Sequence, residues 1–442
     1  MIWLAGIAGR GWAEAQWRGL VVLAVALHTP VISDVAAFTG TPRVLDTTVA
    51  GVPATIALPA GGGRHPAVVF LNGATAAGRH EPHVERLTRA LGDAGFITVV
   101  PDPPGLAQGD LSLRTLRGIE AVVADVSRRP DVSRTGLLGV SVGCSLGMVA
   151  AEDTLARAHL SDISCLAPYV DLRAVIMMAL THRYPVDGRL VPYAPDPFTG
   201  LVIARSLAAG LPPGPGRDVL LVRLLAISDN ARAPLVAVSR IPTAGLDPPE
   251  LALLRLLANR DPARFAGLYA RLPASLRAGV GELSPLAEAR RLHGPVQIAT
   301  SPTDKYFPLV QYGPLQREAP DVQLTVTSVL GHAIPHPSVS NLAGVARLDG
   351  FAVRTLRDFA PPVPLNWLAV AASLLGIALI AAEGWAKRHG LVALAGLVAL
   401  LATVPAITHA GFTLSLLVSV LAVAAGVALA IGMPIRRPRL SG

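Results

Sequence analysis

Short apolar runs alternate with stretches of helical periodicity along most of the chain. Six of the runs have the length and composition of buried strands, at 67–71, 96–100, 135–139, 164–169, 296–300 and 322–326. Two earlier β-type segments, 44–48 and 54–58, are close enough in sequence to form a hairpin. Buried strands that alternate with helices are typical of parallel sheets. The pattern therefore predicts an α/β fold with a mostly parallel sheet and helices on both faces.

Residues 173–290 interrupt this alternation. The stretch is rich in leucine and alanine, is helical in its periodicity, and is broken by prolines and glycines. We interpret it as a helical cap inserted into an α/β domain, whose two parts are 39–172 and 291–362. Its leucine-rich segment 251–272 is a candidate lining for an acyl pocket, although such segments more often form only the core of the cap.

Both ends of the chain are apolar. Three segments within 363–435 approach the ~20 apolar residues that a helix needs to cross a bilayer, near 365–383, 391–407 and 412–433. Near the N-terminus, the shorter segment 19–33 within 1–38 fits an uncleaved signal anchor, with a cleaved signal peptide as the alternative. All five tryptophans lie beside these segments, as in the interfacial belts of membrane proteins. The chain is therefore predicted to have four membrane spans.

Basic residues indicate how these spans are oriented. They flank the predicted spans at three places, as Arg10 and Arg18, as Lys387 and Arg388, and as Arg436, Arg437 and Arg439 in the tail 436–442. Under the positive-inside rule all three groups are cytoplasmic. The α/β domain between the first and second spans is then predicted to lie on the extracytoplasmic side of the cell membrane.

The overall composition agrees with a membrane-bound part. Hydrophobic residues make up 52% of the chain and charged residues 15%, with a mean hydropathy of +0.50, which is more apolar than an ordinary soluble domain. The net charge of +8 comes from scattered arginines rather than from a basic cluster on one element. Binding to a phosphate backbone needs such a cluster, so nucleic acid is not expected as a partner.

The chain has two cysteines, Cys144 and Cys165, which match no metal-binding or redox spacing. We expect both to be small buried residues. A disulfide between them is the alternative if the domain lies in an oxidising compartment.

The strongest candidate for chemistry is a serine between two glycines. Gly139, Ser141 and Gly143 form a GxSxG pattern after a predicted strand and before a predicted helix. A sharp turn there holds the serine in strained backbone geometry, and side chains at the flanking positions would clash. The N–H of Val142, at the start of the helix, then points toward a developing oxyanion. The motif predicts that Ser141 is a nucleophile.

Over about residues 44–360, outside the cap, the chain resembles the α/β-hydrolase superfamily of serine esterases, lipases and dienelactone-hydrolase-like enzymes. The segment PAVVFLNGA resembles the third strand and oxyanion loop, with Asn72-Gly73 where the family usually has His-Gly. This resemblance implies that Ala74 supplies a second oxyanion donor. SPLAEARRLHGPVQIATSPTDKYFP and VQLTVTSVLGHAIPHPS resemble the segments that carry the acid and the base. The resemblance implies that Asp304 and His332 complete a triad with Ser141.

Three other polar features compete with this interpretation. Asp171, after the predicted strand 164–169, is a rival acid, and His336 is a rival base. A third feature is a polar cluster that lacks the HExxH spacing of a zinc site and is better interpreted as a solvated helix start, at His80, Glu81, His83 and Glu85. No metal and no nucleotide cofactor is implied.

The predicted function is hydrolysis of an ester or related acyl bond by a membrane-anchored serine hydrolase. Its expected partners are a small or lipid-like acyl substrate and the membrane, and nothing in the sequence indicates an oligomeric state. An acyltransferase with the same triad is one alternative. A non-enzymatic membrane protein that only binds a ligand on this fold is the other.

Overall fold

The computed structural model describes residues 41–109, 111–152, 160–292, 294–319, 321–336 and 341–360, together with Arg18, Gly19 and Val22. The three predicted C-terminal spans lie outside the described residues, as does nearly all of 19–33. Within the described part of the chain, no helix is both long enough and apolar enough to cross a bilayer.

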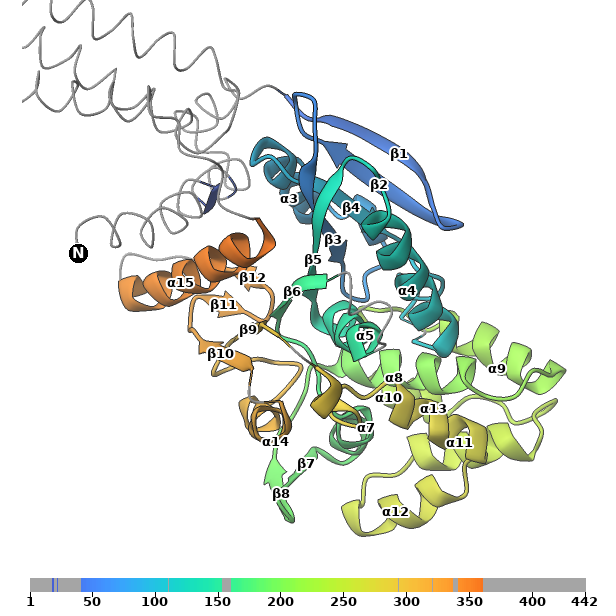
Figure 1. Cartoon of the computed structure of the whole chain (residues 1–442). Helices are drawn as coiled ribbons and strands as arrows, with labels where there is room; N and C mark the ends of the chain where they lie inside the picture. Colours follow the sequence, from blue (N-terminus) through green and yellow to red (C-terminus); the bar gives the residue numbers. More distant parts are fainter. Residues whose placement is uncertain are drawn as a thin grey trace, which may run out of the picture.

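An eight-stranded sheet runs through the molecule in the order β1-β2-β4-β3-β5-β6-β9-β10 (Figure 1). The strands are β1 (Arg43–Val49), β2 (Val52–Leu58), β3 (His65–Leu71), β4 (Ile97–Pro101), β5 (Val132–Val140), β6 (Leu160–Leu166), β9 (Val296–Thr300) and β10 (Val322–Val326). β2 is antiparallel to both of its neighbours, and the pairs from β4 to β10 are parallel. The prediction of an α/β fold with a mostly parallel sheet is confirmed.

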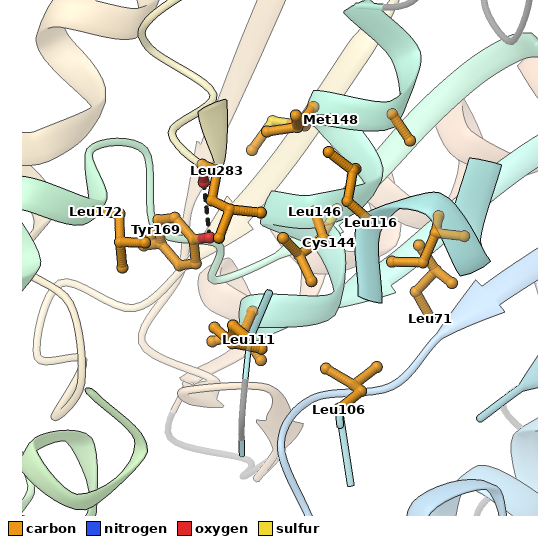
Figure 2. Close-up of a cluster of buried hydrophobic side chains, with 14 of the residues drawn as sticks. Leu71, Leu106, Leu111, Leu116, Cys144, Leu146, Met148, Tyr169, Leu172 and Leu283 are labelled. Carbon is orange, nitrogen blue, oxygen red and sulfur yellow. Dashed lines mark hydrogen bonds between the residues drawn. The ribbon is translucent and has the colours of Figure 1, made fainter. Parts of the chain in front are cut away.

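Helices cover both faces of this sheet, because successive side chains of each strand point to opposite sides and both sides are apolar. On one face, Val68 and Phe70 of β3 pack with α3 (Pro82–Asp93) and α15 (Leu342–Phe359). On the other, Val69 and Leu71 pack with α4 (Leu113–Ser127) and α5 (Ser141–Glu152). Figure 2 shows the second cluster, in which the Tyr169 hydroxyl donates to the Leu283 carbonyl at 2.8 Å.

Between β6 and β9 the chain forms a small hairpin and a group of helices, which lie mostly below α5 in Figure 1. These elements are α7 (Leu172–Thr181), β7 (Arg183–Val186), β8 (Arg189–Pro192), α8 (Pro197–Ala209), α9 (Pro215–Leu225), α10 (Pro234–Ser239), α11 (Pro248–Leu257), α12 (Pro262–Ala270) and α13 (Ala274–Glu282). Five of the helices begin with proline. Proline suits the first helical position because the N–H there has no helical partner. The prolines of this region therefore start helices as well as separating them.

The chain after β9 returns to the sheet. It forms α14 (Tyr312–Glu318), β10, the two-residue strands β11 (Leu330–Gly331) and β12 (Ile334–Pro335), and α15. Short 3-10 turns occur at η1 (Gly78–His80), η2 (Ala289–Arg291) and η3 (Leu309–Gln311). This second part of the fold supplies the two strands at one end of the sheet.

The cysteines and one strand differ in part from what the sequence predicts. Cys144 on α5 and Cys165 on β6 are both buried, as expected, but they are joined by a disulfide, which the sequence offered only as the alternative, with 5.5 Å between their Cα atoms. The strand predicted at 164–169 begins earlier, at Leu160. Its first four residues, 160–163, lay outside the predicted strand because they include the polar residues Ser161 and Asp162. Asp162 and the neighbouring Ser164 show how polar side chains are accommodated in this strand. Both are fully buried, and the Ser164 hydroxyl hydrogen-bonds to the Asp162 carboxylate and to a threonine of α15.

Candidate active site

Ser141 lies at the junction of β5 and α5 with a backbone φ of +52°. A residue with a side chain adopts this left-handed conformation rarely and at a cost of about 1–3 kcal/mol. The two glycines of the motif show what keeps the turn in place. A Cβ on Gly139 would stand 2.7 Å from the Cα of Cys144, and a Cβ on Gly143 would stand 2.0 Å from the backbone oxygen of Asn72. Both glycines are therefore required by close backbone packing.

The loop after β3 lies directly beside the serine. A Cβ on Gly73 would be 3.4 Å from the Cβ of Ser141. The buried side chain of Asn72 shapes this loop, because its Oδ1 accepts the Gly73 N–H at 2.8 Å and its Nδ2 donates to the Gly78 carbonyl at 2.8 Å. The Gly73 N–H is thus engaged, which leaves the next amide, that of Ala74, as the candidate oxyanion donor on this side. Where the resembled family has histidine, this chain uses asparagine to hold the loop.

The second candidate oxyanion donor is the N–H of Val142. It lies in the first turn of α5, where backbone N–H groups have no partner within the helix. The helix dipole adds positive potential at the same end. The donors from α5 and from the loop after β3 are brought together because the oxygen of Asn72 packs against Gly143.

Asp304 lies in the loop after β9, and its side chain is only 1% exposed. Its Oδ1 accepts the backbone N–H groups of Tyr306 at 2.7 Å and Phe307 at 3.0 Å. Its Oδ2 lies 2.7 Å from Nδ1 of His332. The carboxylate is therefore held by the turn of its own loop, with one oxygen committed to the backbone and the other to the imidazole.

His332 follows β11 with a φ of +69°, and its side chain is 11% exposed. Because Nδ1 faces the Asp304 carboxylate, this nitrogen carries the proton and Nε2 is the basic nitrogen of the neutral ring. The imidazole centroid is 4.4 Å from that of Tyr306 and 5.8 Å from that of Phe307. These two aromatic rings limit the rotation of the imidazole and shield its hydrogen bond with Asp304 from water.

The sheet topology explains why residues so far apart in sequence meet. β5, β6, β9 and β10 are parallel neighbours, so their carboxyl ends lie at one edge of the sheet. Ser141 follows β5, Asp304 follows β9, and His332 comes after β10. Asp304 and His332 are hydrogen-bonded, whereas Ser141 and His332 are not hydrogen-bonded to each other in the described structure. In free enzymes, catalytic hydrogen bonds are often long and tighten only when substrate binds.

The rival residues make other contacts. Asp171 is the N-cap of α7, and its Oδ1 accepts the Ala174 N–H at 3.1 Å. His336 is exposed, and its backbone N–H donates to the Val329 carbonyl at 2.7 Å. Asp304, rather than Asp171, contacts the histidine at this edge of the sheet.

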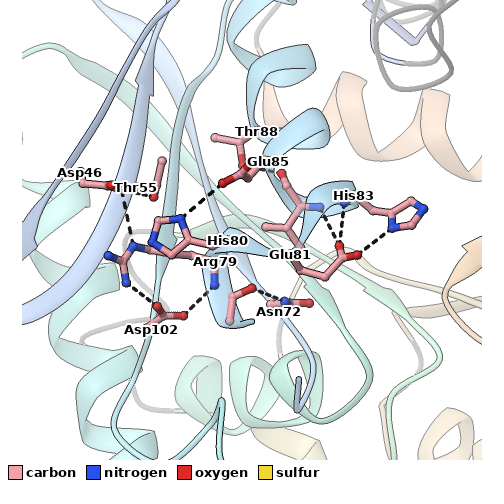
Figure 3. A network of polar contacts seen from close by, with 12 residues as sticks. Asp46, Thr55, Asn72, Arg79, His80, Glu81, His83, Glu85, Thr88 and Asp102 are labelled. Carbon is pink, nitrogen blue, oxygen red and sulfur yellow. Dashed lines mark hydrogen bonds and ion pairs between the residues drawn. The ribbon is translucent and has the colours of Figure 1, made fainter. Parts of the chain in front are cut away.

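The polar cluster after the oxyanion loop consists of separate pairs (Figure 3). Glu81 caps α3 by accepting the N–H groups of His83 and Val84, and it also contacts the His83 ring at 2.7 Å. His80 contacts Glu85 at 3.3 Å. No group of three or more potential metal ligands occurs among the residues that the structure describes. The cluster stabilises the start of α3.

The leucine-rich segment of the cap forms apolar core. Leu253, Leu256, Leu257 and Leu272 are buried in the main hydrophobic cluster. A hollow of about 340 Å³ lies between α7, the β7–β8 turn and α12, and Asp171, Arg173 and Phe265 are among its lining residues. Neither this hollow nor a second one of about 390 Å³ is lined by Ser141, Asp304 or His332.

Two contributors to the site carry no sequence motif. Tyr193, between β8 and α8, donates its hydroxyl hydrogen to the backbone carbonyl of Asp304. Tyr306 packs its ring on the imidazole of His332. Tyr193 is 111 residues from Asp304, so no local pattern pointed to it. Tyr306, in contrast, lies two residues after the candidate acid. This short distance in the sequence is the one feature that could have indicated a place for Tyr306 in the site.

No family model matches this chain, and no curated protein matches its sequence. Among solved structures it is similar to Est1E from Butyrivibrio proteoclasticus, with 14% identity, a TM-score of 0.40, and coverage of 72% of this chain and 99% of that one. It is also similar to a proline iminopeptidase from Mycobacterium smegmatis, with 15% identity, a TM-score of 0.37, and coverage of 72% and 98%. The match to an acylaminoacyl peptidase has 14% identity and a TM-score of 0.39, and covers 72% of this chain but only 40% of the peptidase.

Proposed function

We propose that this chain is a serine hydrolase of the α/β-hydrolase type, in which Ser141, His332 and Asp304 cleave an ester or related acyl bond. The observation that carries the proposal is the buried 2.7 Å contact between Asp304 and His332, at the sheet edge where Ser141 sits in a left-handed turn. A buried carboxylate that orients a histidine, together with a serine hydroxyl at the same sheet edge, is the arrangement of nucleophilic acyl transfer.

In the first half of the reaction, Ser141 Oγ forms a bond to the acyl carbon as its proton passes to His332 Nε2. The bond to the leaving group then breaks, and His332 returns the proton to that group. In the second half, water attacks the acyl carbon and gives a proton to His332. The bond between the acyl carbon and Ser141 Oγ then breaks, His332 returns the proton to Oγ, and the carboxylic acid product leaves. Asp304 stays ionised and stabilises the imidazolium that forms in each half.

The developing oxyanion is stabilised by two backbone N–H groups, from Val142 and Ala74. Their positions follow from the contact between the Asn72 oxygen and Gly143, which keeps the loop after β3 against the start of α5. Donors held in advance do not have to reorganise during the reaction, and one such donor typically contributes a factor of about 10² to 10³ in kcat.

The proposal extends to location. Basic residues beside the apolar segments favour a domain on the extracytoplasmic side of a membrane, held by one N-terminal and three C-terminal spans. The disulfide between Cys144 and Cys165 supports this placement, because disulfides form and persist mainly in oxidising compartments.

A fluorophosphonate probe tests the chemistry before any substrate is known, since it reacts only with an activated serine. Membranes that contain the wild-type chain are expected to be labelled, and Ser141→Ala is expected to abolish labelling while the protein remains folded by circular dichroism. Ser239→Ala, at an exposed position of α10, is the matched control and is expected to label normally. Unchanged labelling of Ser141→Ala would contradict the proposal.

A further inference from the structure

One segment of the insertion runs along the loop that carries the candidate acid. The Tyr193 hydroxyl donates to the backbone carbonyl of Asp304, and the N–H of Asp196 donates to the carbonyl of Lys305 at 2.6 Å. Two consecutive carbonyls of the acid loop are thus bound by residues between β8 and α8. We call residues 193–196 the latch segment.

The latch segment is itself held in place. The Tyr193 N–H donates to the carbonyl of His182 at 3.0 Å, and its ring packs against the main hydrophobic cluster. Asp196 is the N-cap of α8, and its Oδ1 accepts the Phe198 N–H at 3.0 Å. The latch segment can therefore position the acid loop.

Tyr193 remains a hydrogen-bond donor across the working pH range. Burial, and then the negative charge of Asp304, raise the pKa of its hydroxyl above the ordinary value for tyrosine. The hydroxyl consequently stays protonated, and its hydrogen points to the Asp304 carbonyl.

The Asp304 carboxylate is bound by the N–H groups of Tyr306 and Phe307, in its own turn, and by His332, in the loop after β11. The two N–H groups fix the side chain relative to its own loop, and the imidazole connects it to the second loop. The contacts of Tyr193 and Asp196 are the ones that connect the acid loop to the insertion.

We propose that Tyr193 is a positioning residue, which couples the insertion to the acid loop and so holds Asp304 at hydrogen-bonding distance from His332. This inference rests on the proposed function. It predicts that a displacement of the latch segment changes the position of the His332 imidazole, through Asp304 and without a direct contact between Tyr193 and the nucleophile.

The test compares the full-length wild type with Tyr193→Phe, which keeps the aromatic ring and removes only the hydroxyl. Tyr269→Phe on α12 is the matched control, since it makes the same change elsewhere in the insertion. Hydrolysis of p-nitrophenyl butyrate is measured from pH 5 to 9 to obtain kcat and KM, and the rate of fluorophosphonate labelling is measured in parallel. Thermal unfolding shows whether each variant is folded at the assay temperature.

Tyr193→Phe is expected to lower kcat and the labelling rate about tenfold with little change in KM, because the loss lies in orienting His332 rather than in binding. The acidic limb of the kcat/KM profile is expected to move to lower pH, since a poorly placed carboxylate stabilises the imidazolium less. Asp304, Lys305 and Asp196 keep their charges in this variant. A shift of the acidic limb would therefore come from a changed position of the Asp304 carboxylate relative to His332.

The outcomes separate this inference from the proposed function. If the wild type does not react with the fluorophosphonate, the proposed function fails. If the wild type reacts and Tyr193→Phe matches it in kcat and in the acidic limb, only the positioning role fails. A fall in thermal stability with unchanged kcat and an unmoved acidic limb would show that the hydroxyl is merely structural, and would also overturn the inference.

Discussion

The backbone oxygen of Asn72 packs against the Cα of Gly143, so closely that a Cβ there would stand 2.0 Å from the oxygen. This contact joins the loop after β3 to the first turn of α5, and the two candidate oxyanion donors lie on either side of it. A methyl group at position 143 cannot be accommodated unless one of these two backbone segments moves.

Gly143→Ala is therefore expected to lower the free energy of unfolding by about 1–3 kcal/mol, as overpacking does, and to abolish probe labelling. Gly267→Ala on α12 is the control, because a Cβ at that position meets nothing within 4 Å. Alanine is favoured over glycine inside a helix by up to about 1 kcal/mol, so this control is expected to be neutral or stabilising. Chemical denaturation and probe labelling of both variants check the prediction, which fails if Gly143→Ala labels like the wild type.

Asp304→Asn is expected to lower kcat about 10⁴-fold, because an amide cannot hold His332 in the reactive tautomer or stabilise its positive charge. Asp171→Asn is the matched control. Asparagine caps helices as well as aspartate does, so α7 should keep its N-cap and turnover should stay close to that of the wild type. Ester hydrolysis by the two variants is compared at equal protein concentration. A larger loss of kcat in Asp171→Asn than in Asp304→Asn would show that the catalytic acid is Asp171, after β6.

The disulfide closes a short segment between α5 and β6, with its two cysteines 21 residues apart. Removing such a link typically costs about 2–4 kcal/mol. Reduction is expected to lower the midpoint of guanidinium unfolding, and the double variant Cys144→Ala, Cys165→Ala is expected to unfold at this lower midpoint with or without reductant. Thiol titration of the unfolded wild type should detect no free cysteine. Two free thiols in protein purified without reductant would contradict the bond.

Glu152, at the end of α5, makes stability depend on pH. Burial and then the nearby charge of Glu288 raise its pKa to about 8, against the lowering effect of Arg291. The folded state therefore binds this proton more tightly than the unfolded state does. The protonated Glu152 carboxyl contributes in full to the free energy of unfolding below about pH 4.5. This contribution is lost as pH rises through about 8, by up to ~1.4 kcal/mol for each pH unit.

Glu152→Gln is expected to remove most of this dependence and to stabilise the protein at pH 8.5. Glu282→Gln on the exposed side of α13 is the control and should leave the pH profile unchanged. Unfolding by urea at several pH values from 5 to 8.5 gives the slope of the free energy of unfolding against pH for each variant. A Glu152→Gln profile that runs parallel to that of the wild type would rule out this carboxyl as the source.

The proposed topology is tested with reporter fusions after Gly390 and Gly411, between successive apolar segments. The first is expected to report the cytoplasm and the second the exterior, because basic residues adjoin only the first. Protease added outside intact cells, after any outer membrane is permeabilised, should digest the α/β domain. A domain that is protected until the inner membrane is broken would show the opposite orientation.

The sequence by itself determined those features that depend on local physical requirements. The strands at 296–300 and 322–326 were predicted with the bounds that the structure has, because both are short segments rich in valine, isoleucine, leucine and threonine, the residue types that favour strands. Gly139 and Gly143 were recognisable because the turn at Ser141 demands glycine at both positions whatever the rest of the fold does. The α/β class followed in the same way, from buried strands that alternate with helices.

The tertiary structure alone decided which distant polar groups meet. The start of β6 was missed because it contains Asp162, which is buried and accepts a hydrogen bond from Ser164, while Ser164 in turn contacts Thr355 of α15. The link between Cys144 and Cys165, the cap that Asp171 provides for α7, and the hydrogen bond from Tyr193 to Asp304 likewise depend on contacts between separate elements. Side-chain periodicity predicts which face of an element is buried, but it does not predict which other element covers that face. The partner depends on how the whole chain packs.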